Sequence, residues 1–118
     1  MPEKNSYKEI FLIRLNDRII PLQTTEAAYI YSEDKSNYLM TFDQRKYIID
    51  FTLDAAADSL DPAVFFRISR KCLISIKAIS AIIRLPSGRL RIFANPEPSF
   101  EMTVSRSRVD DFLKWLER

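Results

Sequence analysis

Residues 65–75 read Phe65-Phe66-Arg67-Ile68-Ser69-Arg70-Lys71-Cys72-Leu73-Ile74-Ser75. This stretch interleaves large apolar side chains with three cations and two hydroxyls, and two interpretations fit it. In the first, it is a strand and turn whose phenylalanines fill a core while the cations keep the surface soluble. In the second, the cations and hydroxyls contact the phosphates of a nucleic acid. Composition alone leaves both open.

The stretch also holds the only cysteine of the chain, Cys72, which therefore has no intramolecular disulfide partner. Its neighbours Leu73 and Ile74 are apolar, and a thiol in such a setting usually serves as a small buried hydrophobe. We expect Cys72 to be a core residue.

Short apolar runs of strand length lie on both sides of this stretch. They are separated by polar segments at 33–37, 43–45 and 86–88, and the last of these has proline and glycine at turn-favouring positions. Runs rich in branched and aromatic residues predict strands, and tight turns between them predict antiparallel neighbours. The predicted strands are residues 10–15, 27–31, 38–42, 46–51, 79–85, 89–93 and 100–104.

Two segments have helical spacing instead. Behind Thr52, a candidate N-cap, apolar residues recur at i, i+3, i+4 and i+7 from residue 53 to residue 60. The same spacing recurs near the C-terminus, where Ser107 and Asp110 match a capping box. We therefore expect a short internal helix, and a C-terminal helix that starts near Ser107.

The composition bounds the class of protein. At 118 residues with 47% hydrophobic content, the chain fits one domain, because two independent cores would each be too small. We expect residues 1–118 to form this domain, with 1–8 as a loose N-terminal segment. No apolar run approaches the roughly 20 residues that cross a bilayer, and the start lacks the apolar stretch of a signal peptide. We expect a cytoplasmic protein without membrane contact.

Few residues are available for catalysis or cofactor binding. The chain has no histidine, which removes the commonest metal ligand and the commonest acid–base group at neutral pH. Its single glycine, Gly88, excludes a phosphate-binding glycine loop and a dinucleotide fingerprint. Asp54, Asp58 and Asp61 lie in one short stretch, which we interpret as a solvated helix face. We expect no cofactor, no metal and no enzymatic activity.

Charge is distributed unevenly along the chain. From Arg67 to Arg108 there are nine basic residues and two acidic ones, so this segment carries +7 while the remainder carries −5. A concentration of one sign attracts a polyanion, although a solvated basic surface fits the charge equally well. Arg106 and Arg108 flank the expected start of the C-terminal helix, where the helix dipole disfavours cations. An anionic ligand at that place would remove the conflict.

Residues 66–75, the branched-aliphatic strand and Gly88 turn that follow, and the triplet Val104-Ser105-Arg106 together resemble the LytTR DNA-binding domain of bacterial response regulators. A tyrosine-bearing hairpin at 29–39 and the short helix at 52–60 agree, so the resemblance covers nearly all of residues 10–116. It implies a mainly β fold, an elongated stack of small antiparallel sheets with one short internal helix and a C-terminal helix. It also implies sequence-specific binding of duplex DNA by loops that reach successive major grooves.

The resemblance places three of the family's contact positions at Asn37 in the hairpin turn, at Ser75, and at Arg106. It implies promoter DNA with repeated half-sites as the partner. It also implies an upstream receiver domain, for which this chain has no room, or a partner protein. No heptad pattern is visible, so we expect a monomer off DNA. With the basic segment included, the expected DNA-binding residues are Asn37, Arg67, Ser69, Arg70, Lys71, Ser75, Arg106 and Arg108.

The chain departs from the family at two of these positions. The family commonly has histidine where Ser69 stands and asparagine where Ser75 stands. Asparagine donates and accepts together toward adenine, whereas serine offers one short hydroxyl. The departures motivate a second hypothesis, a partner-binding β-module that keeps the scaffold but has weakened DNA contacts. A salt-dependent gel shift separates the two hypotheses.

Overall fold

The computed structural model describes residues 6–118, which form ten strands, two α-helices and three short 3-10 turns. The strands are β1 (Ile10–Leu15), β2 (Arg18–Gln23), β3 (Ala27–Glu33), β4 (Ser36–Thr41), β5 (Lys46–Ile49), β6 (Phe65–Ser69), β7 (Cys72–Ser75), β8 (Ile79–Arg84), β9 (Leu90–Ala94) and β10 (Met102–Val104). The helices are α1 (Leu53–Ser59) and α2 (Val109–Glu117), and the 3-10 turns are η1 (Thr24–Glu26), η2 (Ile76–Ala78) and η3 (Arg106–Arg108).

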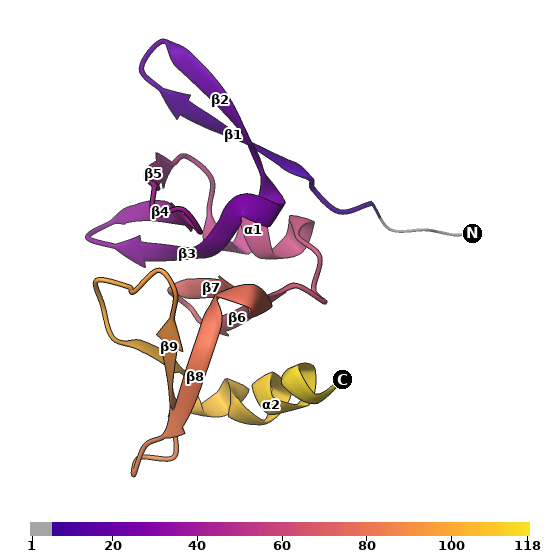
Figure 1. The fold of residues 1–118 in the computed structure, drawn as a ribbon, viewed down its shortest axis with the longest axis vertical. Helices are drawn as coiled ribbons and strands as arrows, with labels where there is room; N and C mark the ends of the chain where they lie inside the picture. The colour runs from indigo at the N-terminus through magenta and orange to yellow at the C-terminus, as the bar shows by residue number, and fades with distance from the viewer. Residues whose placement is uncertain (1–5) are drawn as a thin grey trace.

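The strands form three antiparallel sheets that stack one above another (Figure 1). The hairpin β1-β2 lies at one end, a five-stranded sheet of order β5-β4-β3-β7-β6 lies in the middle, and β10-β9-β8 lies at the other end. The molecule extends 47 × 41 × 24 Å. The expected stack of small antiparallel sheets with a short internal helix and a C-terminal helix is confirmed.

The five-stranded sheet is buried on both faces because its side chains alternate between two hydrophobic clusters. On β7, Leu73 belongs to one cluster, while Cys72 and Ile74 belong to the other. The Leu73 cluster includes Phe11 of β1 and Leu53 of α1. The central sheet therefore forms a layer between the N-terminal hairpin with α1 on one side and the third sheet with α2 on the other.

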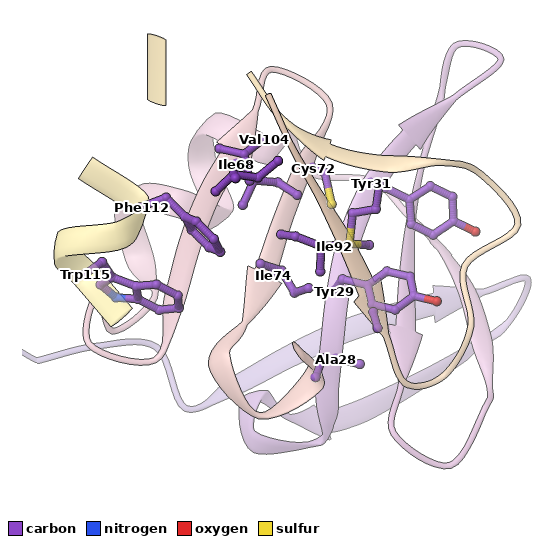
Figure 2. Close-up of a cluster of buried hydrophobic side chains, with 14 of the residues drawn as sticks. Ala28, Tyr29, Tyr31, Ile68, Cys72, Ile74, Ile92, Val104, Phe112 and Trp115 are labelled. Atoms are coloured by element: carbon purple, nitrogen blue, oxygen red, sulfur yellow. The ribbon is translucent and has the colours of Figure 1, made fainter. Parts of the chain in front are cut away.

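The larger cluster joins the central sheet, the third sheet and α2 (Figure 2). Figure 2 shows Ile74, Ile92 and Phe112, one from each of these elements, in a common interior. The rings of Phe66 and Trp115 lie 5.1 Å apart, and the Trp115 indole N–H donates to the carbonyl of Pro62 at 2.8 Å. The apolar stripe of α2 thus packs beside β6. The expected burial of Cys72 is confirmed, and Met102 and Val104 are also buried.

The predicted turn at 33–37 is wrong in its bounds. β3 and β4 continue to Glu33 and from Ser36, so only Asp34 and Lys35 remain between them. Both have positive φ, 51° and 68°. A two-residue hairpin loop of the mirror-image type needs this conformation, and it usually carries asparagine or glycine. The expected turns at 43–45 and 86–88 are confirmed, with positive φ at Gln44 and Gly88.

Of the two predicted helix N-caps, one is confirmed and the other is wrong. The Thr52 side chain accepts a hydrogen bond from the backbone N–H of Ala55 at 3.0 Å, so the predicted N-cap is confirmed. The predicted Ser107 capping box is wrong, because Ser107 lies within η3 and α2 begins at Val109 without a side-chain cap. The 3-10 turn extends the helical backbone ahead of α2, which leaves Ser107 inside it and not before it.

Strand β2 was not among the predicted strands. It contains Pro21, which cannot donate to a sheet ladder and is confined to edge strands, and β2 lies in a two-stranded sheet where both strands are edges. Residues 1–5 of the segment expected to be loose lie outside the described residues. Lys8, also in that segment, is held by its backbone N–H, which donates to the carbonyl of Ser59 at 2.8 Å.

Candidate nucleic-acid interface

Several turns meet at one end of the central sheet. Because β3 pairs antiparallel with β7 and Tyr31 lies opposite Cys72, the β3–β4 and β6–β7 turns lie at the same end. A backbone hydrogen bond joins them, from the N–H of Ser32 to the carbonyl of Lys71 at 2.9 Å. The two hairpin turns are therefore fixed side by side by the main chain.

The third sheet adds two more segments, of which residues 105–108 adjoin the β6–β7 turn and the β8–β9 turn lies farther from the central sheet (Figure 1). The N–H of Ser105, directly after β10, donates to the carbonyl of Ile68 at 3.0 Å. The next residue, Arg106, donates from Nη2 to the carbonyl of Ser87 in the β8–β9 turn at 3.0 Å. We call the four segments together the turn ridge, which comprises residues 34–35, 70–71, 85–89 and 105–108.

The turn ridge is strongly basic. One carboxylate, that of Asp34, belongs to its segments, against six cations. Within residues 6–118, none of these cations takes part in an ion pair, whereas Arg14, Arg45 and Arg91 elsewhere each do. The ridge cations are Lys35, Arg70, Lys71, Arg89, Arg106 and Arg108, of which Arg108 is partly buried and the others are exposed. Their charge is open to an anionic partner.

Arg67 differs from its neighbours, because its guanidinium is engaged within the protein. Nε donates to the carbonyl of Ser69 at 2.8 Å, Nη2 to that of Arg70 at 2.7 Å, and Nη1 to Oδ1 of Asp54 at 2.8 Å. Its side chain is 20% exposed. The structure thus places this predicted DNA contact beneath the β6–β7 turn, where it supports the backbone.

Two other expected contacts also serve the scaffold. Ser75 is 2% exposed, and its hydroxyl accepts from the N–H of Lys77 at the start of η2, so it does not reach the surface. Asn37 lies in β4 and not in the hairpin turn. Its amide accepts from the Ser32 hydroxyl at 2.6 Å and donates to the carbonyl of Phe51 at 3.2 Å. Asn37 therefore ties the β3–β4 hairpin to the chain that leads into α1.

The remaining expected residues lie on or beside the turn ridge. Ser69 starts the β6–β7 turn, where its hydroxyl accepts from the N–H of Lys71 at 3.1 Å. Arg70 and Lys71 are at the tip of that turn. Arg108 approaches the same turn through a long contact of 3.5 Å from Nη1 to the carbonyl of Arg67. The structure therefore brings together residues 37 to 41 positions apart in the sequence.

The electrostatic conflict expected at the start of the C-terminal helix is relieved by carboxylates of the protein itself. Asp110 and Asp111 occupy the first turn of α2, where carboxylates interact favourably with the helix dipole. The positions of Arg106 and Arg108 therefore do not by themselves require an anionic ligand. What points to one is the concentration of cations in the turn ridge.

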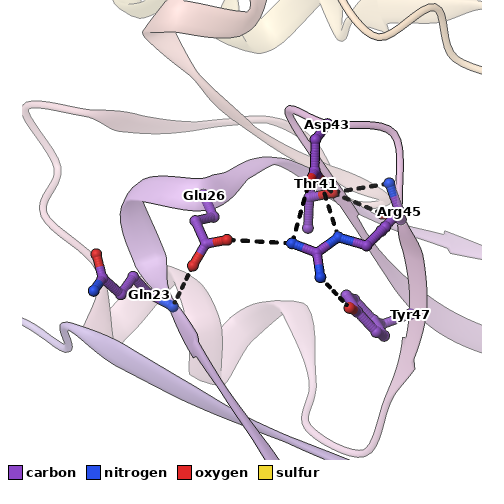
Figure 3. A network of polar contacts seen from close by, with 6 residues as sticks. All are labelled: Gln23, Glu26, Thr41, Asp43, Arg45 and Tyr47. Atoms are coloured by element: carbon purple, nitrogen blue, oxygen red, sulfur yellow. Dashed lines mark hydrogen bonds and ion pairs between the residues drawn. The ribbon is translucent and has the colours of Figure 1, made fainter.

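At the opposite end of β4, a network of polar contacts neutralises Arg45 (Figure 3). Its guanidinium pairs with Asp43 at 3.1 Å and Glu26 at 3.4 Å, and it donates to the Tyr47 hydroxyl. Hydrogen bonds from Thr41 and then from Arg45 lower the pKa of the Asp43 carboxyl below its usual value. Arg45 is therefore compensated within the protein, unlike the cations of the turn ridge.

A reactive thiol and a metal centre are two other kinds of functional site. Burial raises the pKa of the Cys72 thiol, which keeps it protonated and unreactive at neutral pH. No group of three or more metal-ligating side chains occurs in residues 6–118. Nor is any helix in that range long and apolar enough to cross a membrane.

Lys35 is a ridge cation that sequence reasoning missed. It sits in a turn whose two residues adopt positive φ without glycine, so the usual turn signal was weak. Its position next to Asp34 between two alternating strands is the feature that could have identified it.

Comparisons with known proteins identify a family and a solved structure that this chain resembles. The family model described as the LytTr DNA-binding domain matches residues 17–117. Among solved structures, the LytTr DNA-binding domain of a protein described as a methyl-accepting/DNA response regulator from Bacillus cereus superposes with a TM-score of 0.80 at 20% sequence identity, covering 94% of this chain and 99% of that one. No curated protein sequence matches the chain significantly.

Proposed function

Because the chain belongs to the LytTR DNA-binding domain family, we propose that it is the sequence-specific duplex DNA-binding effector domain of a bacterial transcription regulator. The observation that carries this proposal is the turn ridge, where six cations without ion pairs among residues 6–118 meet one carboxylate. Duplex DNA presents one negative charge per roughly 1.7 Å of axis, and cations on a protein bind it by releasing its counterions.

The ridge residues divide by position. Arg70 and Lys71 are exposed at the tip of the β6–β7 turn and Arg106 is exposed at the start of η3. From these places their side chains reach base edges in a major groove about 12 Å wide. Ser69 and Arg108 flank them and contact phosphates, as do Lys35 and Arg89. The longest dimension of the molecule, 47 Å, exceeds one helical repeat of B-DNA, about 34 Å. A molecule of this length can therefore span successive grooves along one face of the duplex.

The proposed context follows from the resemblance and from the printed description of the Bacillus cereus relative as a response regulator. We place this domain in the cytoplasm, without enzymatic activity, as the output of a two-component system whose receiver domain or partner protein supplies the signal. Its target is promoter DNA with repeated half-sites.

Selection of binding sites from a randomised duplex library tests the proposal, followed by affinity measurements at rising salt on the selected duplex. We expect an enriched sequence, and a slope of log affinity against log salt of about −3 if the three cations Lys35, Arg89 and Arg108 each meet one phosphate. An unenriched library together with a flat salt profile would refute the proposal. The partner-binding hypothesis, motivated by Ser69 and Ser75, then becomes the better account.

A further inference from the structure

The Arg67 guanidinium is a candidate for a role other than phosphate contact. Arginine has five N–H donors, and three nitrogen atoms of Arg67 already donate within the protein. Two of the acceptors are the consecutive carbonyls of Ser69 and Arg70, and the third is the carboxylate of Asp54. A single planar group therefore fixes the backbone of the β6–β7 turn from inside.

The partner of Arg67 comes from α1, a different part of the fold. Asp54 lies in the first turn of that helix, and its side chain is 85% exposed while that of Arg67 is 20% exposed. An ion pair with so exposed a member adds little to stability. Its geometric effect is larger, because Asp54 accepts from Nη1 while Nε and Nη2 face the turn.

The supported turn carries the proposed DNA contacts. Arg70 and Lys71 form its tip, and β6 and β7 shift register between Arg67 and Ser69, so the regular ladder does not set the conformation there. At this irregularity the carbonyl of Ile68 accepts from Ser105, and Arg67 donates to the next two carbonyls, those of Ser69 and Arg70.

We propose that Arg67 and Asp54 act as a positioning pair that sets the sequence specificity of DNA binding by holding the β6–β7 turn in one conformation. The inference rests on the proposed function. Arg67 acts through the turn and does not touch DNA, and Asp54 acts through Arg67. This assignment replaces the phosphate contact expected at Arg67 from the sequence.

Charge-matched variants separate positioning from electrostatics. Arg67→Lys keeps the positive charge but loses the planar fork that reaches two carbonyls and a carboxylate. Asp54→Asn and Asp54→Ala remove the same negative charge, yet asparagine keeps an oxygen that accepts from Nη1 and alanine does not. Asp58→Ala is the control, since Asp58 is exposed on the same helix and has no hydrogen bond or ion pair with the described residues. The probes are the duplex selected by the wild-type domain and a scrambled duplex of equal length.

We expect Arg67→Lys to weaken binding to the selected duplex about tenfold, the equivalent of re-ordering roughly one residue of backbone, with binding to the scrambled duplex changed less than twofold. Asp54→Ala should weaken specific binding about two- to fivefold, although removal of a negative charge alone would strengthen it. Asp54→Asn and Asp58→Ala should bind at least as well as wild type. Melting temperatures should stay within a few degrees, which separates these effects from general loss of structure.

Amide hydrogen exchange in the free protein provides a readout without DNA. The N–H of Lys71, which donates to Ser69 Oγ, should exchange faster in Arg67→Lys and Asp54→Ala and at the wild-type rate in Asp54→Asn. Full specific affinity in Arg67→Lys, or an equal loss on both duplexes, would overturn the pair while leaving the DNA-binding function intact. Failure of the wild-type domain to select any sequence would overturn both.

Discussion

Replacing Arg106 with alanine should weaken specific DNA binding while leaving the fold nearly intact. The chain on both sides of Arg106 is held independently of its side chain, since Val104 is fully buried, Val109 is 7% exposed, and Ser105 is bonded to Ile68 through the backbone. The substitution removes one exposed hydrogen bond to the carbonyl of Ser87. Such a bond contributes about 0.5 kcal/mol, which corresponds to a melting temperature lower by about 2–4 °C.

The expected effect on DNA is larger. Nη2 of Arg106 meets Ser87, and its other N–H donors have no partner among residues 6–118, so they are available for a paired contact with guanine or a phosphate. Loss of a bidentate base contact costs about 1–3 kcal/mol, or about 5- to 150-fold in affinity for the selected duplex only. Loss of a phosphate contact would weaken all sequences alike and reduce the salt slope by about one.

Fluorescence anisotropy on the selected and scrambled duplexes, at several salt concentrations, measures both patterns. Arg91→Ala is the matched control, because Arg91 lies on β9, pairs with Glu101 at 3.7 Å and covers the Phe93 ring. Equal losses in the two variants would mean diffuse electrostatics and would refute a privileged contact at Arg106. A lower melting temperature of Arg106→Ala without a change in its DNA affinity would instead show that Arg106 is structural.

Three further predictions concern the scaffold. Thr52→Ala removes the N-cap of α1 and should lower the free energy of unfolding by about 1 kcal/mol in urea denaturation; an unchanged midpoint would contradict the cap. The lowered pKa of Asp43 means that its contribution to stability is present above the usual aspartate range and is lost as the pH falls through the lowered pKa. Asp43→Asn should therefore reduce the dependence of stability on pH below about 4, and an unaltered acid unfolding curve would argue against the network of Figure 3. Sedimentation of the free domain at micromolar concentration should show a monomer, and a tight dimer would contradict that expectation.

Much of the fold was predictable because it depends on local pattern. Short runs of branched and aromatic residues identified most of the strands, and the i, i+3, i+4 spacing identified both helices. The bounds failed where local rules compete with tertiary structure. Pro21 concealed an edge strand, and the left-handed residues Asp34 and Lys35 form a tight turn without the usual glycine. Ser107 matched a capping box by spacing, but a 3-10 turn includes it in the helical backbone.

The candidate site was predictable only in part. The basic composition identified Arg70, Lys71, Arg106 and Arg108. Their proximity depends on a backbone hydrogen bond between Ser105 and Ile68, which the sequence pattern does not predict. Charge also does not reveal which cation faces inward, so Arg67 looked like its neighbours in sequence although it supports the turn from within.

The bonds that join the hairpin turns to each other and to the third sheet run between backbone atoms, from Ser32 to Lys71 and from Ser105 to Ile68. Any residue other than proline donates from the same N–H, so these joints do not depend on which side chains the turns carry. The tips can therefore be diversified while their spacing stays constant, as in an antibody whose loops vary on an unchanging frame. A library randomised at Arg70, Lys71 and Arg106, with Arg67 and Asp54 retained, is accordingly a starting point for domains that recognise new DNA sequences, and gene duplication followed by drift at these positions would give related regulators different targets.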